Sequence, residues 1–186
     1  MSADVARQVR AANIPTIAIN DTAKLAPWAD ILYACDYSWW MHHYEWALKH
    51  GGLKVTCDDS VPFPQVLCLK QSGKSGFDPD PTCIRTGNNG GYQSLHIAIQ
   101  AAAKRILLCG YDMQGGHWFG RHPPNLADDP DVHRREFIPE FEKLAPLLPE
   151  LDVEVINCMP GSALRCFPFG NLEDELNRAS TGNSSA

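Results

Sequence analysis

The sequence predicts an α/β domain with a mainly parallel sheet. Short apolar runs of strand length alternate with longer segments of helical period, and this alternation is typical of strand–helix–strand units. One apolar run, 105–109, stands between a helical segment and the sequence Gly110-Tyr111-Asp112. We therefore expect a buried central strand whose carboxyl end opens onto a loop, which is where parallel sheets bind ligands. With 186 residues the chain can form one such domain with its own core.

Six strands and three helices are expected in this arrangement. Asp36 is a capping-type residue before the first helix, and Gly51-Gly52 ends that helix. Pro139 and Pro146 fall inside the third helix, where they should kink or shorten it. The expected strands are 16–20, 30–35, 53–56, 65–69, 105–109 and 153–157, and the expected helices are 37–50, 92–103 and 135–148.

Two long loops and a polar tail complete the predicted organisation. The segments 71–81 and 115–130 are rich in Gly, Pro and Asp, and loops of this length inside a domain are usually functional or mobile. From residue 178 the chain is polar and contains small residues. We expect a single domain over 1–177 and a disordered tail over 178–186.

Composition and charge exclude several classes of protein. The chain has 16 Lys+Arg against 22 Asp+Glu, a formal charge of −6, and no run of five basic residues, so no nucleic-acid partner is expected. No apolar segment has the length of a membrane span or a signal-peptide core. Seven cysteines without a Cys-x-x-Cys pair indicate free thiols in a reducing compartment, the cytoplasm.

The glycine-rich segment 87–94 is the first candidate binding site. It stands directly before the second helix. Glycines let a ligand approach the backbone, and the start of a helix offers N–H groups and the positive end of a dipole, so an anion or a phosphate fits there. A plain tight turn before the helix is the alternative. The candidate residues are Gly87, Asn88, Asn89, Gly90, Gly91 and Tyr92.

The second candidate site is the segment 110–123. Asp112 follows a strand, and the loop after it holds His117, Arg121 and His122. An acid, two imidazoles and a partner for an anion are therefore close in sequence, as general acid–base chemistry requires. Metal binding by the two histidines with Asp112 is one alternative, and hydrogen-bonded loop residues without a catalytic role are another.

Polar and aromatic residues after the first two strands form a third group. Asn20-Asp21 can contact a base or a ribose, or cap the turn that follows. Asp36 either caps the first helix or faces the cleft at the strand ends. Trp39, His43 and Trp46 share one side of that helix, which favours a packing face over a stacking platform for a ligand.

The order of these motifs along the chain resembles their order in known families. The chain resembles a family of small, uncharacterised bacteriophage proteins, and more distantly it is similar to bacterial sialyltransferases that use CMP-sialic acid, to motility-associated glycosyltransferases and to 6-hydroxymethylpterin diphosphokinase-like proteins. The motifs are Asn20-Asp21, Asn89-Gly90-Gly91-Tyr92, Gly110-Tyr111-Asp112-Met113, the run from His117 to His122, and Asn157-Cys158 with Ser162.

The resemblance implies a Rossmann-like three-layer sandwich that binds a nucleotide at the carboxyl edge of its sheet. Compared with those families, the chain lacks the first strand and its Gly-x-Gly-Pro-Ser-type turn. By similarity to the sialyltransferases, Asn20 would contact the nucleotide and Asn89-Gly90-Gly91 would contact the donor. His122, or His117 after a small shift of the loop, would be the general base, and Gln114 stands near the place of a tyrosine that assists the leaving group.

Three functions follow as alternatives from this resemblance. The first is a transferase that moves a group from a nucleotide-activated donor, such as a CMP-sugar, to an acceptor hydroxyl without a metal. The second is a pterin diphosphokinase-like enzyme that uses Mg-ATP, with Asp112 and Asp21 as the magnesium ligands. The third is a non-catalytic phage protein in the host cytoplasm that binds a nucleotide or a host protein, and that forms a homo-oligomer through an exposed sheet edge.

Overall fold

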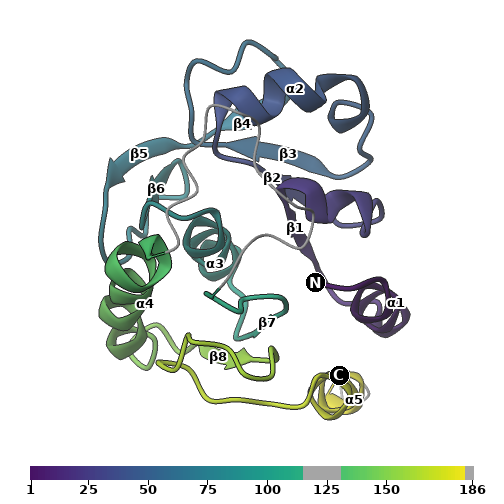
Figure 1. The fold of residues 1–186 in the computed structure, drawn as a ribbon, viewed down its shortest axis with the longest axis vertical. Helices are drawn as coiled ribbons and strands as arrows, with labels where there is room; N and C mark the ends of the chain where they lie inside the picture. Colours follow the sequence, from purple (N-terminus) through teal and green to yellow (C-terminus); the bar gives the residue numbers. More distant parts are fainter. Residues whose placement is uncertain (115–130, 183–186) are drawn as a thin grey trace. The chain divides into compact units, whose positions relative to one another are not determined.

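The structure, a computed structural model, describes residues 1–114 and 131–182 (Figure 1). These residues form two compact units: unit 1 is Met1–Ala12 with Ala103–Ala186, and unit 2 is Asn13–Ala102. Both units combine helices with parallel strands. The predicted α/β class with mainly parallel strands is confirmed.

The largest sheet lies in unit 2 and has four parallel strands. Its members are neighbours both in sequence and in space, in the order β1-β2-β3-β4. All four match strands expected from the apolar runs, because each run is short, apolar and bounded by turn residues. The strands are β1 (Ile17–Ile19), β2 (Ile31–Tyr33), β3 (Leu53–Thr56) and β4 (Val66–Cys68).

Two helices cover opposite faces of this sheet. Successive residues of a strand point to opposite faces. Leu32 of β2 packs with Trp40 of α2 (Tyr37–Ala47) in one core cluster, whereas the next residue, Tyr33, packs with Ile97 of α3 (Gly90–Gln100) in another. A 3-10 helix, η1 (Asn20–Lys24), connects β1 to β2.

The chain after β4 corrects one expectation from the sequence. The polar segment 71–81 was expected to be a loop, but β5 (Lys70–Gly73) pairs with β6 (Cys83–Arg85), so residues up to Gly73 are strand. The polar composition of β5 is misleading because contacts with β6 stabilise the strand. Arg85 Nη1 of β6 donates to Ser72 O of β5 at 2.7 Å. A side chain at Gly73, whose φ is +136°, would collide with that guanidinium.

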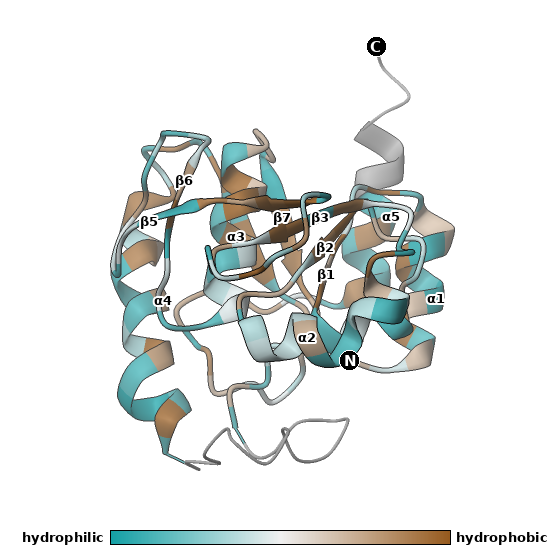
Figure 2. Cartoon of the chain, turned by 90° about the horizontal axis from the view of Figure 1, so that it is seen from above, coloured by the Kyte–Doolittle hydropathy of each residue, from teal (hydrophilic) through white to brown (hydrophobic). Residues whose placement is uncertain are grey.

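Unit 1 is built around a second pair of parallel strands, β7 (Arg105–Leu108) and β8 (Glu154–Asn157). Both match expected strands, and β7 is drawn mainly in the brown of apolar residues in Figure 2, unlike the polar β5. The helices α1 (Ala3–Ala12) and α5 (Leu172–Gly182) contact each other. An ion pair joins Arg105 to Glu175 of α5. Helix α5 runs through residue 178, where the sequence places the start of a tail.

The third predicted helix is divided into three pieces by its prolines. A π-helical turn (His133–Phe137) leads into α4 (Ile138–Leu144), and a 3-10 turn (Ala145–Leu147) follows. Pro139 stands in the first turn of α4, where the missing N–H is tolerated. The α-helical part is therefore shorter than the predicted helix, although helical turns continue from His133 to Leu147. On its inner face, Phe141 of α4 meets the rings of Tyr111 and Phe167 edge to face.

Candidate functional site

Polar residues follow the carboxyl ends of the first three strands of unit 2. Asn20 follows β1, Asp36 lies three residues beyond β2, and Asp58 lies two residues beyond β3. Because these strands are parallel and adjacent, their carboxyl ends lie along one edge of the sheet. This edge is where ligands of open parallel sheets bind.

Asn20 has an acceptor that no group of the described chain uses. Its Oδ1 atom is buried and has no hydrogen-bond partner among the described residues. Its backbone is left-handed, with φ of +51°. A buried polar atom without a partner is costly, and such atoms in native proteins call for an explanation. One explanation is a ligand that supplies the missing donor.

Asp21, the neighbour of Asn20, is fully engaged within the protein. It forms an ion pair with Lys24, and Trp39 Nε1 donates to its Oδ2 at 3.3 Å. Burial raises the pKa of Asp21, but the hydrogen bonds from Lys24 and Trp39 and the nearby His43 outweigh that effect, so the pKa is lowered. The predicted ligand or magnesium role of Asp21 therefore competes with these contacts.

The aromatic residues of α2 pack as expected from their spacing. The Trp39 ring is buried and lies edge to face with Trp46 at 5.6 Å between centroids. Trp46 Nε1 donates to His43 Nδ1 at 3.2 Å. The Nε2 of His43 lies 3.6 Å from Asp21 Oδ1. Both ring nitrogens of His43 are thus engaged, and this face of the helix is a packing face.

Asp36 stands at the position that caps α2, but Asp58 makes the bond. In the described part of the chain the Asp36 side chain makes no capping hydrogen bond. Instead, Tyr37 N donates to Asp58 Oδ2 at 3.0 Å, so a residue from the end of β3 caps the helix that precedes β3. Asp36 remains half-buried at the sheet edge, beside the thiol of Cys35. Burial and then the charge of Asp36 raise the pKa of that thiol.

The glycine-rich segment forms the start of α3 beside β1. Asn89 is the N-cap, and its Oδ1 accepts from Tyr92 N at 3.0 Å. The two glycines predicted before the helix belong to its first turn. A methyl group at Gly90 would lie 3.4 Å from Ile19 Cγ2, which places the beginning of α3 against the end of β1. Asn88 and Gly87 before the cap are both left-handed.

The side chains of this segment divide into buried and edge residues. Tyr92 is fully buried, and its hydroxyl donates to Gly76 O at 2.6 Å. A methyl group at Gly87 would overlap the Tyr92 ring. Gly87 and Tyr92 therefore hold the segment in place, whereas Asn88, Gly90 and Gly91 are half-buried or exposed at its end.

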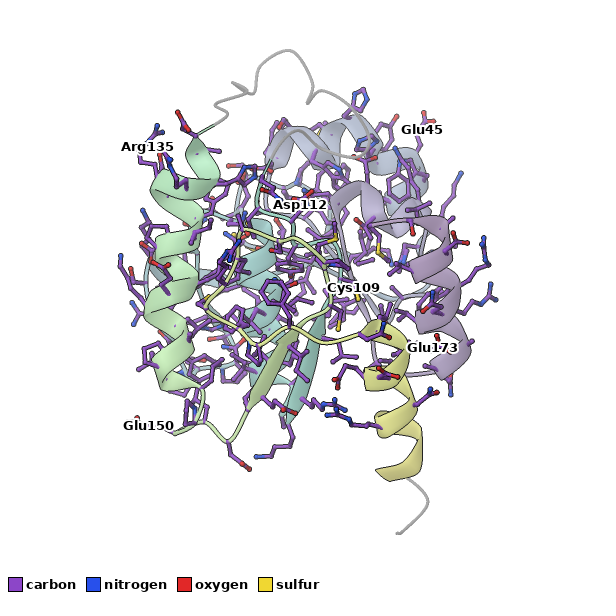
Figure 3. The ribbon with its side chains drawn as sticks, turned by 60° about the horizontal axis from the view of Figure 1, so that its bottom comes forward. Glu45, Cys109, Asp112, Arg135, Glu150 and Glu173 are labelled. Atoms are coloured by element: carbon purple, nitrogen blue, oxygen red, sulfur yellow. The ribbon has the colours of Figure 1, made fainter. Side chains whose placement is uncertain are left out.

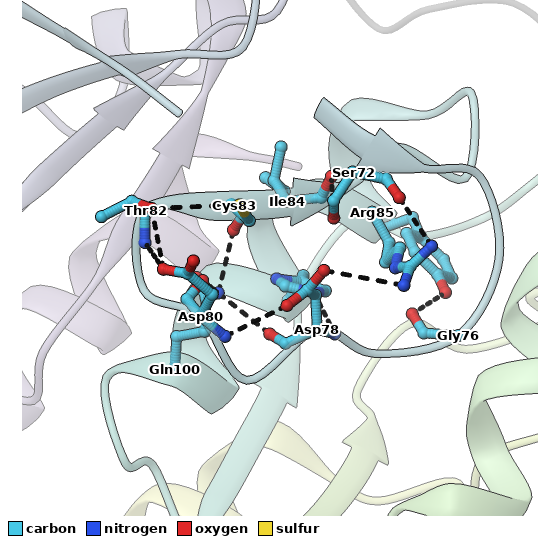
Figure 4. A network of polar contacts seen from close by, with 11 residues as sticks. Ser72, Gly76, Asp78, Asp80, Thr82, Cys83, Ile84, Arg85 and Gln100 are labelled. Atoms are coloured by element: carbon cyan, nitrogen blue, oxygen red, sulfur yellow. Dashed lines mark hydrogen bonds and ion pairs between the residues drawn. The ribbon is translucent and has the colours of Figure 1, made fainter. Parts of the chain in front are cut away.

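Polar side chains along α3 hold the segment 76–83 against this helix by hydrogen bonds. His96, four residues after Tyr92, is fully buried, and its Nε2 accepts from Asp78 N at 3.0 Å. Gln100 Nε2, one turn further, lies within hydrogen-bond distance of the carbonyls of Asp78, Asp80 and Cys83 (Figure 4). Burial lowers the pKa of His96 to about 4. The segment expected to be a loose surface loop is therefore tied to α3.

A buried cluster, which no pattern in the sequence predicted, connects α3 to the ends of β2 and β3. The Tyr33 hydroxyl donates to Gln93 Oε1 at 2.8 Å and lies 3.3 Å from Cys57 Sγ. Burial raises the pKa of the Cys57 thiol. All seven cysteines are free, and the raised pKa values of Cys35 and Cys57 make these two thiols poor nucleophiles.

The candidate residues of unit 1 lie where β7 and β8 end. Figure 3 labels Asp112 in the segment after β7. The Ser162 hydroxyl donates to Tyr111 O at 2.5 Å, and its oxygen accepts from Leu164 N at 3.0 Å. Gln114 Nε2 donates to Gly161 O at 2.6 Å. These bonds fasten the two strand ends to each other, so Ser162 and Gln114 have structural roles in unit 1.

The remaining candidates lie outside the described residues. These are His117, Arg121 and His122, together with the rest of the 115–130 segment that was expected to be a loop. Among residues 1–114 and 131–182, no group of three or more His, Cys, Asp or Glu side chains is placed to hold a metal ion. In the same residues, no helix is long and apolar enough to cross a membrane.

Comparisons of the chain with protein-family models, with curated proteins and with solved structures found no match. The assignment of a function therefore depends on the residues and geometry described above.

Proposed function

We propose that the chain binds a nucleotide at the carboxyl edge of the unit 2 sheet, in a Rossmann-like domain, and transfers a group from it to an acceptor hydroxyl. The observation that carries the binding part is the buried Asn20 Oδ1 without a partner in the described chain. The transfer part comes from the resemblance to sialyltransferases and other glycosyltransferases. The host cytoplasm is the expected compartment.

The geometry of unit 2 suggests how a nucleotide would be held. An amino or hydroxyl group of the ligand would donate to Asn20 Oδ1 and satisfy it. The first turn of α3, which meets Ile19 at the same strand end, would receive a phosphate, because the positive end of the helix dipole favours negative charge. The glycines at 90 and 91 leave the backbone accessible to such a ligand.

The transfer step would use residues named by the resemblance. His122, or His117 in its place, would remove the proton of the acceptor hydroxyl, and Asp112 would orient that histidine or the donor. The acceptor oxygen would then bond to the donor carbon while the bond from that carbon to the phosphate oxygen breaks. The nucleotide leaves with the electron pair, and protein dipoles can stabilise its charge without a metal.

The Mg-ATP alternative is less well supported by the contacts in unit 2. It requires Asp21 as a magnesium ligand, and the Asp21 carboxylate already pairs with Lys24 and accepts from Trp39. The two reactions differ in metal dependence. EDTA should abolish a pyrophosphate transfer from ATP and leave a metal-independent glycosyl transfer unchanged.

A thermal-shift panel tests the binding part of the proposal. The purified chain would be melted with CMP, CDP, UDP, GDP, CMP-sialic acid, and ATP with and without Mg²⁺. A ligand at about a hundred times its Kd adds about 2.7 kcal/mol, which should raise the Tm of a chain of this size by about 5 to 10 °C. A shift with a cytidine or uridine nucleotide without metal supports the proposal, and no shift across the panel contradicts it.

Matched variants locate the binding to Asn20. Asn20→Gly removes the amide and keeps the left-handed backbone accessible, so it should remove most of the shift. Asn171→Gly is the control, because it deletes the same side chain at the start of α5, where Asn171 Oδ1 accepts from Glu173 N. An unchanged shift in Asn20→Gly would exclude Asn20 from the site.

A further inference from the structure

We propose that the exposed face of α2 pairs with the same face of a second copy of the chain, with the two helices antiparallel about a two-fold axis. The inference concerns unit 2 alone and does not depend on nucleotide binding. It places the contact between copies on a helix instead of the sheet edge expected from the sequence.

Large apolar side chains are exposed along one stripe of α2. Among the residues that the structure describes, six large apolar side chains are exposed, and three of them belong to this helix. Tyr37, Met41 and Tyr44 are 42%, 39% and 43% exposed, and their spacing places them on one side of the helix. Phe63 extends the stripe, because its ring stacks on that of Tyr44 at 6.1 Å between centroids. Exposed apolar patches rich in Tyr, Phe and Met are typical of protein interfaces.

The stripe is complementary to itself. Read from either end of the helix, it consists of a tyrosine, a methionine and a tyrosine. When two copies of α2 lie antiparallel, Tyr37 of one copy comes opposite Tyr44 of the other, and the two Met41 side chains meet near the axis. An interface with two-fold symmetry needs such a match, because the same patch is used by both copies. The contacts are then aromatic pairs and thioether–aromatic pairs, which are both favourable.

The charges around α2 have opposite signs at its two ends. At the beginning of the helix lie Asp58, which accepts from the first N–H of the helix at 3.0 Å, and the exposed Asp59. At its end lie the exposed Lys49 and, just beyond the helix, Lys54, whose Nζ donates to Gly52 O at 3.0 Å. The surface around the stripe is therefore acidic at one end and basic at the other.

This separation of charge favours the antiparallel pair. In that arrangement the acidic end of each copy faces the basic end of the other, so opposite charges meet twice, and the two helix dipoles also oppose each other. A parallel pair would bring like charges together. Glu45 stands one turn before Lys49 and offsets part of its charge. The apolar stripe therefore supplies most of the attraction, and the charges select the orientation.

Sedimentation equilibrium tests whether the chain pairs. One copy has a mass of 20.6 kDa. We expect the average mass to rise toward twice this value over about 1 to 200 µM, with a Kd on the order of 10 µM, because an interface of this small size is weak. A mass that stays at the monomer value over the whole range would overturn the proposal.

A matched pair of variants locates the contact. Met41→Arg places two like charges together at the two-fold axis and should raise the Kd at least about tenfold. Leu67→Arg is the control, because it puts the same charge on a similarly exposed apolar residue of β4, at the edge of the sheet, and should leave the Kd unchanged. Weaker pairing in Leu67→Arg alone would place the contact at the sheet edge, and pairing unchanged in both variants would also overturn the assignment to α2.

A charge exchange tests the antiparallel orientation. Lys49→Glu and Asp59→Lys should each raise the Kd about two- to tenfold, since each change acts twice in a symmetric pair. The double variant should return to within about twofold of the wild type, because opposite charges face each other again. The chain has a formal charge of −6, so a general effect of net charge would instead strengthen pairing in Asp59→Lys. Stronger pairing in that variant, or a double variant weaker than both single ones, would overturn the antiparallel arrangement.

Discussion

Two asparagines at the carboxyl ends of strands differ in what surrounds their amides. Asn157 ends β8 in unit 1 and is fully buried. Its Nδ2 donates to Leu164 O and its Oδ1 accepts from Met159 N, each at 3.0 Å. Asn20 follows β1 in unit 2, and its buried Oδ1 has no partner in the described chain. The same residue type at equivalent strand ends is satisfied in one unit and left open in the other.

The contrast separates a strand end that the protein closes with its own hydrogen bonds from the one at which we propose that a ligand binds. In unit 1, the amide of Asn157 and the hydroxyl of Ser162 bond backbone groups and close the strand ends on themselves. In unit 2, Asp58 bonds the first N–H of α2, whereas His96 and Gln100 of α3 hold the segment 76–83, which leads into the beginning of β6. The Oδ1 atom of Asn20 is left without a hydrogen-bond partner among the described residues.

The largest expected effect on stability concerns the packing of Gly87 against the Tyr92 ring at the beginning of α3. Gly87→Ala should lower the free energy of unfolding by about 4 kcal/mol, because the methyl group would overlap the buried Tyr92 ring and the φ of +51° strains any residue with a Cβ. Urea unfolding followed by circular dichroism measures the change. Gly51→Ala is the control, since its methyl group would meet nothing within 4 Å. Equal effects of the two variants would contradict the packing of Gly87 on Tyr92.

Removing the hydrogen-bonded amide of Asn157 should lower the free energy of unfolding more than removing the amide of Asn20. Asn157→Ala is expected to destabilise the protein by about 3 kcal/mol, because it leaves Met159 N and Leu164 O without their partner and opens a small cavity. The same unfolding measurement gives the value. A change below about 1 kcal/mol would mean that water or a shifted backbone replaces the amide, and the contrast with Asn20 would then disappear.

Lowering the pH should weaken the hydrogen bond by which His96 holds the 76–83 segment. The pKa of His96 is about 4 in the fold and 6.5 in the unfolded chain, so between these pH values the unfolded chain binds more protons. Neutral His96 therefore makes its full contribution to the free energy of unfolding above about pH 7, and this contribution is lost as the pH falls toward 4. At 1.36 kcal/mol per pKa unit, the loss amounts to about 3 kcal/mol by pH 4.

The variant His96→Gln measures this contribution. Its unfolding free energy should fall less steeply between pH 7 and pH 4 than that of the wild type, because Gln does not titrate. Gly51→Ala is again the control, since it changes no titratable group and its methyl group would meet nothing within 4 Å, so it should leave the wild-type slope unchanged. The assignment to His96 fails if both variants keep the wild-type dependence on pH.

The smallest effect on stability is expected for Asn20. Asn20→Gly should change the free energy of unfolding by less than about 1 kcal/mol, and in the stabilising direction, because it removes an unsatisfied buried acceptor and suits the left-handed backbone. Thermal unfolding without ligand measures it. A loss near that of Asn157→Ala would show that the Asn20 amide has a partner within the protein, and the comparison between the two strand ends would break.

Much of the fold could be predicted from local pattern, and the errors have physical causes. The apolar runs at β1, β2, β3, β4, β7 and β8 were predicted because a buried strand needs consecutive apolar residues. The strands β5 and β6 were not predicted, because the polar β5 depends on its partner and on Arg85. The start of α3 was predicted two residues late, since two glycines disfavour a helix locally and the Asn89 cap outweighs them.

The α/β class, most strands, the packing face of α2 and the polar residues at the strand ends could be predicted from the sequence, because they depend on spacing along the chain. Which of the polar groups are used depends instead on contacts that form in the folded chain. The fold assigns the cap of α2 to Asp58 instead of Asp36, engages Asp21 with Lys24 and Trp39, and leaves Asn20 Oδ1 without a partner among the described residues. Hydrogen-bond satisfaction joins residues far apart in sequence, so it is decided by the fold and not by local pattern.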